Sequence, residues 1–109
     1  MKRGEVWTVA GAGDYGRKPR PVVIVQDDRF DAMASVTACA FTSDPTEAPL
    51  IRLLVEPSEQ NGLNVVSRLM VDKITTVPKS KLGIRIGRLA DGDMLRLNRA
   101  MLIFLGLAG

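Results

Sequence analysis

Hydrophobic and polar residues alternate in short runs along most of the chain, and this pattern predicts a protein built mainly from β-strands. The runs are rich in valine, isoleucine and threonine, which favour strands, and polar or glycine- and proline-containing segments separate them. Asn61-Gly62 is a strong signal for a tight hairpin turn. We expect strands at residues 5–10, 21–26, 35–42, 51–55, 65–71 and 84–89.

A different local pattern follows the fifth of these runs. A threonine at position 75 or 76, then Pro78 and finally Gly83, predicts a single capped helical turn over residues 75–83. The threonine would be the cap, and Pro78 would lie near the first helical position. Gly83 would end the turn.

The end of the chain has the spacing of an amphipathic helix. Asp91 is the expected N-cap, and the helix is expected to run to about Leu105. Its apolar face would serve either as core packing or as a dimer seam. The residues on this face are Met94, Leu95, Leu97, Met101, Leu102 and Leu105. The whole pattern predicts a mainly β fold, a small and strongly twisted antiparallel sheet or partial barrel of five or six strands with a terminal helix.

Composition narrows the chemistry that this fold can perform. A length of 109 residues indicates one domain, residues 1–109. The chain contains no histidine, which excludes a histidine-based triad and most zinc sites, and its carboxylates show no metal-binding spacing. We therefore expect neither a metal nor a cofactor. Any catalysis must use arginine, lysine, hydroxyl groups or carboxylates.

Charge and the remaining composition favour a cytoplasmic protein. The single cysteine, Cys39, lies in an apolar run and is expected to be buried, which fits a reducing compartment. No apolar run approaches the roughly 18 residues of a membrane helix, so no membrane association is expected. A net charge of +3 and a pI near 9.4 fit either an ordinary solvated surface or a polyanionic partner.

Arg20 is the first candidate for chemistry. It lies between Pro19 and Pro21, at the start of an apolar strand and after a glycine-rich loop. Prolines restrict the backbone, so the guanidinium would be held in place to bind a phosphate and stabilise the charge of a pentacoordinate transition state. Alternatively, Arg20 caps its strand or pairs with Asp27 or Asp28.

Hydroxyl groups at the end of the third expected strand are the second candidate. Thr42 and Ser43 form an ordinary strand-to-loop transition or, functionally, place a hydroxyl beside Arg20. The end of one strand often faces the start of its neighbour in a small sheet. Such a hydroxyl would orient a phosphate oxygen or a ribose 2′-OH.

The glycine-rich loop carries four further candidates for contact with RNA. Asp14 and Tyr15 are either a solvated pair or a proton acceptor and a base-stacking ring. Arg17 and Lys18 add positive charge for a phosphate backbone. Four more cations could extend a basic groove, and these are Arg68, Lys73, Lys79 and Lys81.

The order of these motifs resembles that of the MazF/PemK family of toxin endoribonucleases. The resemblance covers essentially the whole chain, and its main segments are Gly4-Glu5-Val6-Trp7, residues 18–25 (KPRPVVIV) and Phe41-Thr42-Ser43. It implies a homodimeric SH3-like barrel that cuts single-stranded RNA at short motifs without a metal. It also implies a cognate antitoxin whose C-terminal segment blocks the RNA groove.

The resemblance also implies roles for individual residues. The family's loop-end arginine corresponds to Arg20 and its strand-end threonine to Thr42. Many relatives carry a glutamate in the loop where this chain reads Gly13-Asp14-Tyr15-Gly16, so the general base is left open. Many also carry a basic residue where this chain has residues 74–76 (ITT).

RNA carries its own nucleophile, so a protein without histidine can still cleave it. The 2′-OH attacks the neighbouring phosphate, and the protein needs to align the groups and stabilise the developing charge. Arg20 would stabilise the phosphorane and Thr42 would position it. The products would be a cyclic phosphate or 3′-phosphate and a 5′-OH.

Two other classes of function stay open at this point. One is a toxin of the same fold that poisons DNA gyrase by binding alone. Relatives of that type use a tryptophan near their C-terminus, whereas the single tryptophan here is Trp7. The other is a catalytically inactive barrel that serves as an RNA-binding module, which the presence of both Arg20 and Thr42 disfavours.

Overall fold

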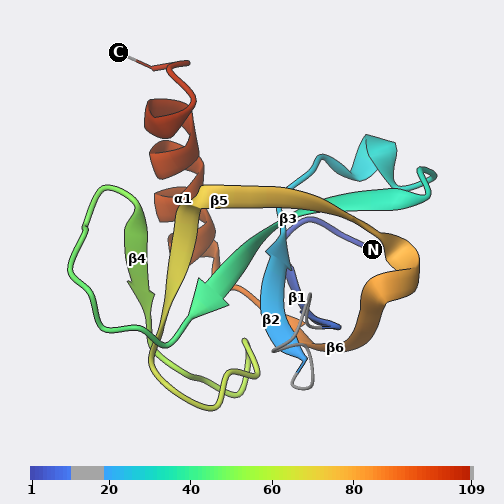
Figure 1. Ribbon diagram of the computed structural model, residues 1–109, viewed down its shortest axis with the longest axis horizontal. Helices are drawn as coiled ribbons and strands as arrows, with labels where there is room; N and C mark the ends of the chain where they lie inside the picture. Colours follow the sequence, from blue (N-terminus) through green and yellow to red (C-terminus); the bar gives the residue numbers. More distant parts are fainter. Residues whose placement is uncertain (11–18, 109) are drawn as a thin grey trace.

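A computed structural model describes residues 1–10 and 19–108 and shows a curved β-sheet with one C-terminal α-helix (Figure 1). This confirms the predicted fold class. In chain order the elements are β1 (Glu5–Val9), β2 (Arg20–Ile24), the 3-10 turn η2 (Asp28–Phe30), β3 (Ser35–Thr42), β4 (Arg52–Val55), β5 (Ser67–Pro78), the 3-10 turn η3 (Lys79–Lys81), β6 (Leu82–Arg88) and α1 (Asp91–Phe104).

All pairings in the sheet are antiparallel, and the strand order is β4-β5-β3-β2-β1-β6. β5 is the longest strand, and its first part pairs with β4 while β3 pairs along most of its length. A register irregularity between Cys39 and Phe41 bends the β3–β5 pair. β5 arches across the molecule as a result, and β6 continues the curve to reach β1 (Figure 1).

The helical turn predicted at residues 75–83 is wrong. β5 continues through Pro78, and only Lys79–Lys81 form a short 3-10 turn. Neither threonine caps a helix, because both lie within β5 opposite β3, and the Thr76 hydroxyl bonds to that of Thr37 across the two strands at 2.7 Å. The β-branched run at residues 74–77 gains more from this pairing than from a local cap.

One apolar cluster fills the space between the sheet and α1, which packs against β4 and β5. Alternating residues of the strands point into it, as their two-residue period requires. Its members are Val6, Val23, Cys39, Phe41, Val55, Leu63, Leu69, Val71, Leu89, Met94, Leu97 and Ala100. Core packing is therefore confirmed for Met94 and Leu97 of the predicted face, with Met101 packed at the edge of the cluster, but Leu95 is exposed.

The rest of the predicted helix differs in two respects. Ala90 occupies the N-cap position without a side-chain bond, and Asp91 is the first helical residue, so the predicted aspartate cap is wrong. The carboxylates of Asp91 and Asp93 instead lie in the first turn, where they complement the helix dipole. Towards the C-terminus, Leu102 and Leu105 are exposed in the described chain.

The connection between β4 and β5 is anchored by Asn61 and Gly62. The buried Asn61 side chain accepts hydrogen bonds from the Ser58 and Leu63 backbones and donates one to Glu56. Gly62 has φ +73°, and a Cβ there would lie 2.7 Å from the Ile86 carbonyl carbon. The turn signal at Asn61-Gly62 therefore marks a real turn, but this turn lies within a connection that is longer than a tight hairpin.

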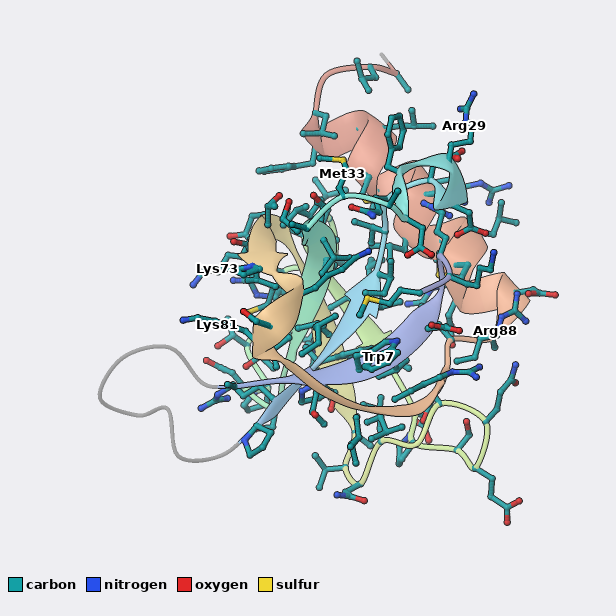
Figure 2. The ribbon with its side chains drawn as sticks, turned by 90° about the vertical axis from the view of Figure 1, so that its right-hand side faces the viewer. Trp7, Arg29, Met33, Lys73, Lys81 and Arg88 are labelled. Carbon is teal, nitrogen blue, oxygen red and sulfur yellow. The ribbon has the colours of Figure 1, made fainter. Side chains whose placement is uncertain are left out.

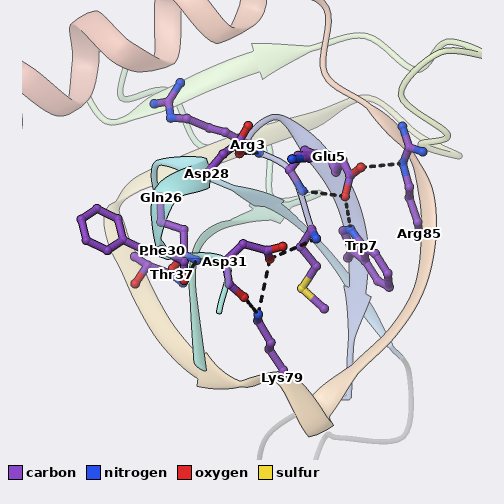
Figure 3. Close-up of polar contacts among 12 residues, drawn as sticks. Arg3, Glu5, Trp7, Gln26, Asp28, Phe30, Asp31, Thr37, Lys79 and Arg85 are labelled. Atoms are coloured by element: carbon purple, nitrogen blue, oxygen red, sulfur yellow. Dashed lines mark hydrogen bonds and ion pairs between the residues drawn. The ribbon is translucent and has the colours of Figure 1, made fainter. Parts of the chain in front are cut away.

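Polar side chains link β1 to the edge strand β6. The Glu5 carboxylate accepts a hydrogen bond from Trp7 Nε1 at 3.0 Å and pairs with Arg85 of β6 at 3.5 Å (Figure 3). Burial raises the pKa of Glu5. Hydrogen bonds from the Lys2 backbone and Trp7, together with the charge of Arg85, outweigh this effect, so the pKa of Glu5 lies below its ordinary value. Glu5 thus stays ionised and ties β1 to β6.

Cys39 is fully buried in the sheet, as predicted, and its Sγ lies 3.4 Å from the Met70 carbonyl oxygen. Burial raises the pKa of this thiol to about 12. We therefore expect no reaction with Ellman's reagent at pH 8 in the native protein, because the thiolate is neither formed nor accessible. One thiol should react after unfolding in guanidinium chloride. Labelling of the native protein at the rate of the unfolded one would contradict this burial.

Candidate active site

A cavity of about 310 Å³ lies where the start of β2 meets the end of β3. Arg20, Thr42 and Ser43 all line it, so the structure brings together the three described residues that the sequence singled out. The remaining walls come from the prolines that flank Arg20, from Phe41 and from the start of β5. They are Pro19, Pro21, Phe41, Val65 and Ser67.

The register of β2 and β3 explains why Arg20 and Thr42 meet. Val22 pairs with Ala40 and Val23 pairs with Cys39. Continuing this antiparallel register by two residues places Arg20 opposite Thr42. Directly opposite residues project to the same face of a sheet, so the guanidinium and the hydroxyl serve one site.

Arg20 is exposed, and its guanidinium makes no hydrogen bond to the residues that the structure describes. The alternative pairing with Asp27 or Asp28 is wrong, because both carboxylates lie beyond the other end of β2. Asp27 instead binds Arg29, and Asp28 accepts a bond from the Arg3 backbone at 2.7 Å. A charged fork with five donors thus faces the cavity.

The Thr42 hydroxyl is oriented by the loop that follows it. Its Oγ1 accepts a hydrogen bond from the Asp44 backbone N–H at 3.1 Å. Since this bond uses a lone pair, the hydroxyl hydrogen is left to donate. Beside an arginine, such a donor would add a second contact to a phosphate oxygen. Ser43 is exposed at the rim of the same cavity.

None of the other cations that the sequence proposed for a basic groove lines the cavity, although Arg68 lies directly opposite Thr42 in the β3–β5 pair. Arg68 contacts Glu47 at 3.4 Å, and Lys79 is held by the backbone and carboxylate of Asp31 (Figure 3). Lys73 of β5 and Lys81 of η3 are exposed (Figure 2), and neither lines the cavity. Among the described residues, Arg20 is therefore the cation that lines the cavity, with Arg68 beside Thr42 on the neighbouring strand.

Four further candidates, Asp14, Tyr15, Arg17 and Lys18, lie outside the described residues. Within residues 1–10 and 19–108, no cluster of three or more histidine, cysteine or acidic side chains could hold a metal ion. No helix in the described part of the chain is long and apolar enough to cross a membrane.

Sequence reasoning missed the wall formed by Val65 and Ser67. Ser67 is buried, and its hydroxyl donates to the Val65 carbonyl at 3.0 Å, which fixes the start of β5 against the cavity. No local signal pointed to this wall, because the consecutive valines at residues 65 and 66 predicted only the start of a strand.

Known proteins share both this sequence and this architecture. The model of the PemK-like, MazF-like toxins of type II toxin–antitoxin systems matches residues 2–105. A probable endoribonuclease MazF of Mycolicibacterium smegmatis is 58% identical over 109 residues, with 100% of both chains covered. A solved endoribonuclease from a mycobacterial species, in complex with its cognate antitoxin, is 26% identical and has a TM-score of 0.82, over 100% of this chain and 98% of that one.

The curved sheet, the terminal helix and the cavity with Arg20 and Thr42 define a small β toxin of this class. The chain belongs to the PemK-like, MazF-like toxin family of type II toxin–antitoxin systems. The resemblance drawn from the sequence motifs is thereby confirmed.

Proposed function

We propose that this toxin is an endoribonuclease that cuts single-stranded RNA at short sequence motifs, without a metal, through attack of the 2′-OH. The observation that carries the proposal is the meeting of Arg20 and Thr42 in one cavity on adjacent strand ends. The general activity is the one that the relative of 58% identity bears in its name. Toxins that only bind gyrase would not need this pair.

The reaction would proceed by transfer of the phosphoryl group within the RNA. The 2′-oxygen forms a bond to the adjacent phosphorus, the bond from phosphorus to the 5′-oxygen breaks, and the 5′-oxygen takes up a proton. The products are a 2′,3′-cyclic phosphate and a 5′-OH end. Arg20 would neutralise the additional charge of the phosphorane, and Thr42 would hold a non-bridging oxygen. Asp14 is the candidate acceptor for the proton that leaves the 2′-OH, and Tyr15 is the candidate for stacking on a base.

Two protein partners complete the proposal. A cognate antitoxin would place its C-terminal segment in the RNA-binding cleft, which is supported by the antitoxin complex of the solved relative. A second copy of the chain would cover the apolar end of α1, where Leu102, Leu105 and Leu107 are 44%, 58% and 72% exposed. Exposed apolar patches of this kind mark interaction surfaces. Cytoplasmic localisation stays a prediction from the sequence.

Cleavage of a long RNA in the presence of EDTA tests the proposal. Purified protein should produce discrete cuts with 5′-OH ends, mapped by primer extension and end-specific ligation. A matched oligonucleotide with a single 2′-deoxy sugar at the cut position should stay intact, because the nucleophile is absent. Cleavage of the deoxy substrate would rule out 2′-OH attack. Absence of cuts across several RNAs would favour a binding-only toxin.

A further inference from the structure

A second cavity, of about 340 Å³, adjoins the one that holds Arg20 and Thr42. The two cavities share Pro19, Pro21, Val65 and Ser67 as walls, so they lie side by side, and together they are called the cleft. The second lies between β1, β6 and the connection from β4 to β5. An RNA strand with one phosphate at Arg20 would therefore place the base of a neighbouring nucleotide in this second cavity.

The walls of the second cavity suit a flat apolar ring. Pro21, Leu63, Val65 and Ile86 contribute aliphatic surface on several sides. Unpaired RNA bases are recognised when they are splayed out of the strand, packed against side chains and hydrogen-bonded along an edge. An apolar slot next to a phosphate site has the chemistry to hold one such base.

The polar side chains of this cavity differ in whether their hydrogen-bonding groups are already used within the protein. Thr8 Oγ1 already accepts a hydrogen bond from the Ile84 backbone at 3.0 Å, and the Ser67 hydroxyl already donates to Val65. Asn64 is exposed, and its amide makes no hydrogen bond within the described ranges 1–10 and 19–108. Its side chain therefore has a donor and an acceptor, side by side, for a ligand.

We propose that Asn64 determines sequence specificity by reading the edge of one unpaired base next to the cut phosphate. This inference rests on the proposed ribonuclease activity. A side-chain amide can form two hydrogen bonds with a base edge that presents a donor and an acceptor in the matching order. Asn64 thus contacts the substrate away from the reacting atoms and selects which sequences are cut.

Sequencing of cut sites in a pool of random RNA, in EDTA, tests this assignment. The wild type should prefer one base at a position adjoining the cut, and Asn64→Ala should reduce that preference about tenfold, because a two-bond contact is lost. Asn64→Asp should shift the preference towards guanine, whose edge offers two neighbouring donors to a carboxylate that only accepts. Cleavage at the wild-type motif should fall in both variants, because the contact that selects this motif is lost.

Asn98→Ala is the matched control, since it removes an amide on α1 that binds Arg3 and lines no part of the cleft. Its cut motif should equal that of the wild type. An unchanged motif in both Asn64 variants would overturn the specificity assignment alone. Loss of all cleavage in Asn64→Ala would also overturn it, by making Asn64 essential to the reaction. Absence of cleavage by the wild type would instead reject the proposed function.

Discussion

Replacement of Arg20 by alanine should lower the single-turnover rate of RNA cleavage by at least about a hundredfold, the typical cost of removing one donor that stabilises a transition-state charge. Arg20 presents its guanidinium to the cavity without a partner among the described residues. The loss should appear at every cut site, because the phosphate is common to all of them. Rates measured in EDTA with a short RNA that contains one site check this expectation.

Arg20→Lys separates charge from geometry at the same position. A lysine keeps the positive charge but cannot form the two parallel hydrogen bonds of a guanidinium, so its rate should fall between those of the wild type and the alanine variant. Both variants should unfold at the wild-type temperature, because Arg20 is exposed. Cleavage by Arg20→Ala at the wild-type rate would remove Arg20 from the mechanism.

Gly62→Ala should destabilise the protein by at least about 3 kcal/mol. Gly62 has φ +73°, a conformation that disfavours side chains, and its Cβ would collide with the backbone of Ile86 in β6. The clash cannot be relieved by a rotamer change, because the atoms it meets are main-chain atoms. Urea unfolding followed by Trp7 fluorescence measures the change in the free energy of unfolding.

Gly92→Ala is the control for this glycine effect. Gly92 lies in the first turn of α1, and a Cβ there meets nothing within 4 Å in the described structure. Alanine should therefore change the stability by less than about 1 kcal/mol, in the stabilising direction. Equal stability of the Gly62 and Gly92 variants would show that the β4–β5 connection rearranges and that its contact with β6 is dispensable.

The strands around the site could be predicted from the sequence, and their meeting followed from their order. β3 was expected at residues 35–42 and is found at Ser35–Thr42. Because its end faces the start of β2, a hydroxyl beside Arg20 was a direct consequence of neighbouring antiparallel strands. Local alternation was sufficient here, since β2 and β3 are consecutive in the chain and pair with each other.

Prediction failed where a distant partner overrides a local signal. The threonines before Pro78 have the chemistry of a helix cap, but β3 offers them a pairing edge that no local pattern reveals. The cavity wall at Val65 and Ser67 was missed for a related reason. Its position depends on the contact of Gly62 with β6, which joins residues far apart in the sequence.

The contacts of Asn61 and Gly62 divide the segment from residue 61 to residue 66 into a part that holds the fold and a part that is free to contact a ligand. Asn61 is buried with its amide oxygen and nitrogen both hydrogen-bonded, and Gly62 is pressed against Ile86, whereas Asn64, Val65 and residue 66 are exposed immediately afterwards. Mutations at positions 64 to 66 can therefore accumulate without disturbing the scaffold. Under the proposed assignment, a lineage of such toxins could diversify its RNA targets while conserving its shape, and an engineer could retarget the enzyme at the same positions.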